Sequence, residues 1–124
     1  MKKEIWLTEP ETHDFPAAQD YLELICSPEV AMNIVARLKR AKTVNKKAKD
    51  ILRASGLVLL TKENRHVKEN IKKVKDGKKL SPILLVVFNG CLIIADGYHR
   101  CCSIYAGLSE DLTIPCRIVY FNTK

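Results

Sequence analysis

Apolar residues are densest in two short runs, SPILLVVF at 81–88 and CLIIA at 91–95. Only Asn89 and Gly90 separate these runs, and Asn-Gly is the dipeptide that two-residue type I′ hairpins prefer. The pattern therefore predicts a β-hairpin. A third apolar run, TIPCRIVYF at 113–121, predicts the last strand of the chain.

Two segments have the spacing of amphipathic helices. Residues 27–40 begin with Ser27 and Pro28, which suit the N-cap and the first position of a helix. The apolar residues of this segment fall on one helical face: Val30, Ile34, Val35 and Leu38. Residues 61–77 predict a second helix, with Thr61 as its N-cap and Gly77 as its stop. Its apolar stripe consists of Val67, Ile71 and Val74.

The remaining elements follow from weaker patterns. YLELIC at 21–26 alternates and predicts a strand after an acidic lead-in. A short strand is expected near 43–48, then a turn or two of helix closed by Gly56, and a helix over 98–106 with Gly107 as its C-cap. Mixed β and α elements predict an α/β (α+β) fold: one domain, residues 1–124, with a small mixed sheet, a central hairpin and packed helices.

The charge of the chain is distributed unevenly. The formal net charge is +7, but residues 37–79 carry sixteen Lys and Arg against four Asp and Glu. This basic segment indicates a polyanionic partner: a phosphate-bearing small molecule, a nucleic acid backbone or an acidic protein. A solvated surface that serves solubility is an equally weighted alternative. Lys46, Lys47 and Lys49 add positive charge that could face the phosphate site, but for these three lysines simple solvation is the favoured interpretation.

Location and redox state are predicted from what the sequence lacks. No apolar stretch typical of a secretory signal follows Lys2 and Lys3, and no run is long enough to span a membrane. Five cysteines, an odd number with two adjacent, do not suggest a disulfide framework. We therefore expect a soluble cytoplasmic protein with no membrane partner, whose cysteines stay reduced.

Polar residues gather where the hairpin gives way to the helix at 98–106. Gly97 allows a sharp turn, after which the first N–H groups of the helix carry partial positive charge. Arg100 can grip phosphate oxygens with its planar fork, and His99 can donate or titrate near neutral pH. Asp96 has several open roles: fixing His99 or Arg100, capping the helix, holding a metal ion or accepting a proton.

The sequence around this point resembles the superfamily of ParB N-terminal domains and sulfiredoxins. The resemblance covers residues 45–120: KAKDILRAS, the helix ENRHVKENIKKVKDGKKL, the hairpin, DGYHR and IPCRIV. It implies a core over residues 45–124, preceded by an extension over 1–44 with a strand and a helix, in which the glycine-led helix start binds nucleotide phosphates. The implied cofactor-binding residues are Gly97, Tyr98, His99 and Arg100, together with Asn64, Arg65 and His66.

The sequence also departs from individual members of that superfamily. Sulfiredoxins resemble G-G-C-H-R here, and Asp96 and Tyr98 replace the first glycine and the reacting cysteine, so sulfinic acid reduction is not expected. Chromosome-partitioning ParB proteins resemble G-E-R-R at this point, which also differs from D-G-Y-H-R. Free-serine kinases of the superfamily carry variants closer to D-G-Y-H-R, so phosphoryl transfer is retained as a candidate reaction.

The resulting hypothesis is a nucleotide-binding domain that takes ATP or CTP with Mg²⁺ and, if it is an enzyme, transfers a phosphoryl group or hydrolyses the nucleotide. Asp96 and His99 are the candidate catalytic residues, and Asp96 is also the candidate metal ligand. The alternative is a noncatalytic module that binds nucleic acid or protein through the basic segment 37–79.

The cysteines are less promising as site residues. Cys101 and Cys102 lie near a helix start beside Arg100, where a thiol can be activated, but a core position is favoured for both. Cys91 and Cys116 are expected in the core as strand residues. No cysteine or histidine spacing suits zinc, so a metal would be Mg²⁺ that accompanies a nucleotide.

Overall fold

The computed structural model describes residues 5–109 and 112–123. The helices in these ranges are α1 (Asp14–Leu22), α2 (Pro28–Arg40), α3 (Ala48–Ser55), α4 (Arg65–Lys75) and α5 (Tyr98–Gly107). The strands are β1 (Val44–Lys47), β2 (Ile83–Phe88), β3 (Cys91–Asp96) and β4 (Thr113–Phe121). No helix in the described ranges has the length and apolar character needed to cross a membrane.

The four strands form one mixed sheet in the order β1-β4-β2-β3. β2 and β3 form the predicted antiparallel hairpin, and Asn89 and Gly90 both have the positive φ, 50° and 83°, that a type I′ turn needs. β4 pairs parallel with β2 and antiparallel with β1. The predicted α+β class, with a small mixed sheet and packed helices, is confirmed.

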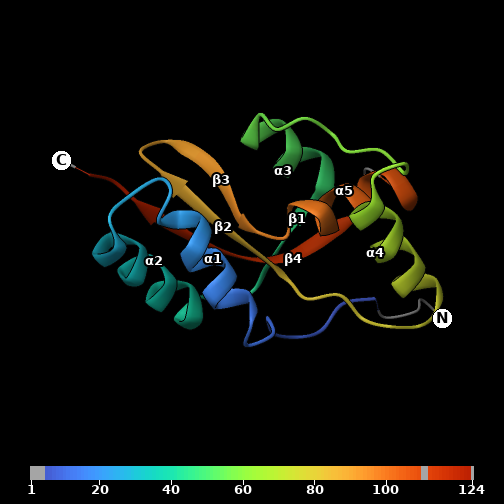
Figure 1. Cartoon of the computed structure of the whole chain (residues 1–124), viewed down its shortest axis with the longest axis horizontal. Coiled ribbons are helices and arrows are strands. Elements are labelled where there is room, and N and C mark those ends of the chain that lie inside the picture. The colour runs from blue at the N-terminus through green and yellow to red at the C-terminus, as the bar shows by residue number, and fades with distance from the viewer. Residues whose placement is uncertain (1–4, 110–111, 124) are drawn as a thin grey trace.

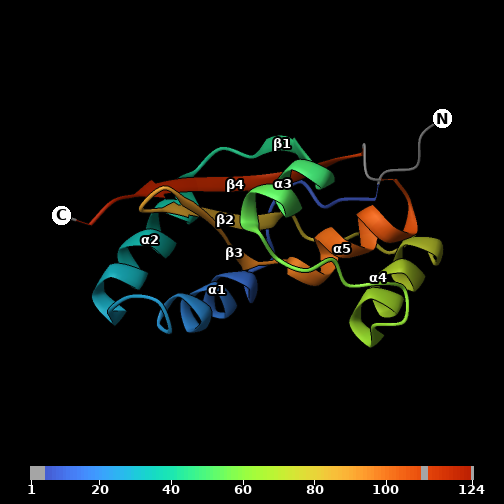
Figure 2. The same cartoon turned by 90° about the horizontal axis from the view of Figure 1, so that it is seen from above.

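Helices cover both faces of this sheet (Figures 1 and 2). Leu84 and Val86 of β2 belong to a core cluster that includes buried residues of α1 and α2. Their neighbours Ile83 and Leu85 point to the opposite face and join a cluster with buried residues of α3, α4 and α5. The alternation along β2 therefore builds two hydrophobic layers, one on each side of the sheet.

The N-terminal residues take part in both layers. Trp6 is buried in the cluster with α3, α4 and α5, and it forms a parallel bridge with Leu80, just before β2. α1 and α2 supply the helical cover of the other face. Residues 5–44 thus pack against the sheet and helices that the later residues form.

Several predicted caps are confirmed. Ser27 is the N-cap of α2, where its hydroxyl accepts the Val30 N–H at 3.2 Å, and Pro28 is the first helical residue. The short strand near 43–48 is β1, and α3 ends at Gly56 with φ +68°. These local signals are enough to predict where the helices begin and end, because each cap satisfies backbone groups that the helix itself leaves unpaired.

The strand predicted for residues 21–26 is wrong. α1 runs to Leu22, and residues 23–26 form a turn into α2. Ala18 and Leu22 are both fully buried, so the apolar positions follow a helical i, i+4 spacing. Leu24 remains 84% exposed, which shows that the alternation beyond Leu22 does not face the core.

Two predicted caps are also wrong. The N-cap of α4 is Asn64, not Thr61: the Asn64 side chain accepts the N–H groups of His66 and Val67. The Thr61 hydroxyl instead lies 2.6 Å from a Glu63 carboxylate oxygen. Gly107 is the last residue of α5 and Leu108 is its C-cap.

Candidate functional site

Gly97 makes the sharp turn from β3 into α5 that the sequence predicts. Its φ is +108°, a conformation that L side chains rarely adopt. A β-carbon at this position would lie 2.7 Å from the β-carbon of Ile83 in β2. Both the backbone angle and the contact with β2 therefore require glycine. The turn leaves the first N–H groups of α5 without intrahelical partners.

Helix α4 lies against α5 on the side away from β2, and the two helices pack closely. Ser103 Oγ lies 2.7 Å from the His99 carbonyl oxygen and 3.3 Å from the Val67 carbonyl oxygen, within hydrogen-bond distance of both. One turn later, a β-carbon on Gly107 would lie 2.7 Å from Ile71 Cδ1, so glycine permits the close approach. As a result the rings of His66 and His99 meet edge to face, with centroids 4.8 Å apart.

A polar hollow of about 240 Å³ lies where these elements meet. It is lined by four residues of α4 and by the turn and first residues of α5: His66, Glu69, Asn70, Lys73, Asp96, Gly97, Tyr98, His99 and Arg100. A larger hollow of about 530 Å³ lies beside α3, where the cations Lys49 and Arg53 share the lining with apolar and aromatic side chains. The smaller hollow is the better candidate site because its lining is almost entirely polar.

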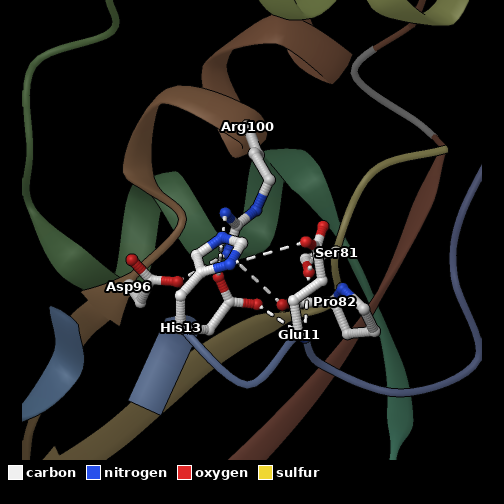
Figure 3. Close-up of polar contacts among 7 residues, drawn as sticks. Glu11, His13, Ser81, Pro82, Asp96 and Arg100 are labelled. Atoms are coloured by element: carbon white, nitrogen blue, oxygen red, sulfur yellow. Dashed lines mark hydrogen bonds and ion pairs between the residues drawn. The ribbon is translucent and has the colours of Figure 1, made fainter. Parts of the chain in front are cut away.

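Asp96 fixes Arg100, which is one of the roles that the sequence leaves open. An Asp96 carboxylate oxygen accepts a hydrogen bond from Arg100 Nη2 at 2.8 Å, and the Pro82 carbonyl oxygen lies 3.3 Å from the same nitrogen. Figure 3 shows the Arg100 side chain extending from its helix toward these groups. The N-cap position of α5 is held by Gly97, which has no side chain to accept a helix N–H, and the Asp96 carboxylate is instead engaged by Arg100.

The expectation that Arg100 presents a free fork to a phosphate is therefore not met in this structure. Its guanidinium is paired with Asp96, while the His99 ring packs against His66. The reason is the partial burial of the Asp96 carboxylate, which favours a cation close by. Burial also raises the pKa of the Asp96 carboxyl; Arg100 opposes this rise, and Asp14 adds to it.

The aromatic groups of the turn are also partly desolvated. Burial lowers the pKa of His99, and the neighbouring His66 lowers it further. Burial likewise raises the pKa of Tyr98, whose hydroxyl donates a hydrogen bond to the Val58 carbonyl oxygen in the α3–α4 connection. Tyr98 thus fastens that connection to the start of α5, beside the hollow.

The three secondary candidates end up in different places. His66 lines the hollow. Asn64 is absent from its lining and uses its side chain as the N-cap of α4. Arg65 is 82% exposed, pairs with Glu69 at 3.4 Å and also does not line the hollow. Of these three residues, the structure brings only His66 to the site.

Sequence reasoning missed three lining residues of α4: Glu69, Asn70 and Lys73. A signal was present, because they follow His66 at i+3, i+4 and i+7 and therefore share its helical face. The lysines of residues 46–49 do not line this hollow. Lys46 and Lys47 lie on the exposed strand β1, and Lys49 borders the larger hollow beside α3.

Among the residues that the structure describes, the buried cysteines are poor candidates for a reactive thiol. Cys101, Cys102 and Cys116 are buried, and burial raises the pKa of Cys101 to about 12 and that of Cys116 to about 11. Cys91 is exposed at the start of β3, so its predicted core position is wrong: the residue opens the strand right after the hairpin turn. In the described residues, no group of three or more His, Cys, Asp or Glu is arranged to hold a metal ion.

Comparison with known proteins gives no match: neither a protein-family model, nor a curated protein, nor a solved structure is significantly similar to the chain.

Proposed function

We propose that the hollow binds a phosphate-bearing small molecule, with a nucleotide such as ATP or CTP as the ligand class to test first. The observation that carries this proposal is that the open first turn of α5 faces the same hollow as His66, His99 and Lys73. Unpaired N–H groups at a helix start favour an anion, and Lys73 and the imidazoles add donors around it. The resemblance of DGYHR to ParB and sulfiredoxin helix starts supports the same ligand class.

The size of the hollow favours the phosphates over the rest of a nucleotide. Pockets that enclose a whole small-molecule ligand usually measure about 300–1,000 Å³. At about 240 Å³ this hollow suits one or two phosphate groups, with the sugar and base outside it. Binding should therefore depend on the phosphates more than on the base.

The residues do not fit a metal ion held by the protein. Asp96 is already paired with Arg100, and the described residues contain no cluster of three ligating side chains. Any reaction is proposed to be phosphoryl transfer or nucleotide hydrolysis. For such a reaction His99 is a better proton acceptor than Asp96, because the lowered pKa of His99 favours the neutral imidazole.

Isothermal titration calorimetry with ATP, CTP, ADP and GTP, each with EDTA and then with Mg²⁺, tests the binding proposal. We expect Lys73→Gln and His99→Gln to weaken binding about three- to thirtyfold each, since the first replaces a cation and the second an imidazole with a neutral amide, a weaker donor to a phosphate. Lys75→Gln is the matched control, because Lys75 is an exposed lysine of the same helix that does not line the hollow. Equal losses in Lys73→Gln and Lys75→Gln would mean that only general charge matters.

The alternative function makes a different prediction in the same experiment. A nucleic-acid-binding module would show no response to any nucleotide and would bind duplex or single-stranded nucleic acid with a steep salt dependence. The loss of affinity would then spread over the basic segment 37–79 rather than concentrate at the hollow.

A further inference from the structure

The segment before α1 is attached firmly to the chain just before β2. The Leu7 N–H donates to the Leu80 carbonyl oxygen at 2.8 Å, and the Glu11 N–H lies 3.1 Å from Ser81 Oγ. The same Glu11 N–H donates to an Asp14 carboxylate oxygen at 3.0 Å. Asp14, in the first turn of α1, is therefore held in a fixed position relative to the start of β2.

Asp14 is a buried acid whose charge needs a partner. It is 1% exposed, and a buried carboxylate is costly unless a cation or hydrogen-bond donor lies nearby. His13 Nε2 lies 3.5 Å from one of its oxygens, but the His13 side chain is 73% exposed, so solvent screens that pair. The better shielded cation is Arg100, whose Nη1 lies 3.8 Å from the same oxygen.

Arg100 is thus approached by carboxylates from two segments that are far apart in the sequence. Asp96 lies at 2.8 Å and Asp14 at 3.8 Å. The Arg100 Nε–H, by contrast, is buried without a hydrogen-bond partner in the described structure. An unsatisfied buried donor costs roughly 1–3 kcal/mol, so the contacts at the two Nη atoms must decide the orientation of the guanidinium.

We propose that Asp14 is a positioning residue of the hollow: Asp14 and Asp96 form a carboxylate clamp that keeps the Arg100 guanidinium on Asp96 and away from a bound phosphate. Asp14 does not line the hollow itself; it acts through Arg100, for whose guanidinium the two carboxyl groups compete with a phosphate. A phosphate then binds toward His66, His99 and Lys73. With the clamp opened, the fork of Arg100 is available for charge-assisted hydrogen bonds to phosphate oxygens.

The clamp itself is tested without any ligand, by NMR of the Arg100 side chain. In the wild-type protein we expect separate Nη signals, because contacts on both sides hinder rotation of the guanidinium. Asp14→Asn should speed the exchange between these signals and broaden them, whereas Asp20→Asn should leave them unchanged, since Asp20 is an exposed aspartate of the same helix. Averaged Nη signals in the wild-type protein would overturn the clamp, and this result does not depend on whether a variant folds.

The effect on the hollow rests on the proposed function and is measured separately, as ATP affinity. Asp14→Asn should raise the affinity by about threefold or more, since one charge-assisted contact is gained. In an Arg100→Gln background the same substitution should give no gain. An unchanged or lower affinity in folded Asp14→Asn, or an equal gain without Arg100, would overturn the proposal. If the wild-type protein binds no ATP while its Nη signals behave as expected, the clamp stands and the proposed function fails.

Discussion

A β-carbon on residue 97 would lie 2.7 Å from the β-carbon of Ile83, so Gly97 is in contact with β2 at the point where the chain turns into α5. Gly97→Ala must distort this contact and also adopt φ +108°. We expect the free energy of unfolding to fall by roughly 2–5 kcal/mol, from backbone strain and overpacking together. Urea denaturation measures this loss.

Gly90→Ala is the control for the backbone angle alone. Gly90 also has a positive φ, +83°, but a β-carbon there would meet nothing within 4 Å. We expect a loss of about 1–3 kcal/mol, the usual cost of such strain. Equal losses for the two variants would show that the contact with Ile83 contributes nothing.

The lowered pKa of His99 gives a prediction for stability against pH. Because the folded state disfavours protonation of His99, its stabilising effect is present above the unfolded pKa of about 6.5 and is lost as the pH falls through the folded value. The wild-type protein should therefore lose more stability between pH 7 and pH 5 than His99→Gln. Parallel pH dependences of the two proteins would contradict this cause of the shift.

The cysteines should differ sharply in reactivity. Cys91 is exposed and should be alkylated within minutes by iodoacetamide near pH 8. Cys101 and Cys116 are buried with raised pKa values and should react only after unfolding. Mass spectrometry of peptides labelled with and without urea distinguishes the sites. Fast labelling of Cys101 in the native protein would show that its environment is open.

Arg117 is a buried cation that holds the end of α2. Its Nη1 donates to the carbonyl oxygens of Leu38 and Lys39, at 3.2 and 2.8 Å. Arg117→Met should lower the free energy of unfolding by roughly 2–4 kcal/mol, because it leaves two carbonyl groups at a helix C-terminus without their charged donor. Arg37→Met is a control that removes an arginine from α2 itself. A smaller loss for Arg117→Met than for Arg37→Met would contradict this account.

Local patterns predicted much of this fold. Asn89-Gly90 between two apolar runs predicted the hairpin, and Ser27-Pro28 before a helical stripe predicted the start of α2, because these signals act within a few residues. The turn at Gly97 was predicted for the same reason. The strand at 21–26 failed because a short apolar alternation overlaps with a helical stripe, and only packing on the sheet decides between them.

The interior of the candidate site was less predictable. The sequence places Asp96 and Arg100 on adjoining elements, but nothing in it indicates that Asp14 completes their ion-pair network. That contact joins residues 86 positions apart and depends on how α1 docks beside β3. The i, i+3, i+4, i+7 spacing of polar residues predicts the polar face of α4. It does not predict that this face meets the start of α5.

The most direct test of the phosphate-binding proposal is an ATP titration followed by the backbone amide signals of the protein. We expect the amides of Tyr98, His99 and Arg100 to shift most, with a common affinity, because the ligand accepts their N–H groups. Saturable shifts confined to the hollow beside α3, around Lys49 and Arg53, with the amides of 98–100 unmoved, would contradict the proposal.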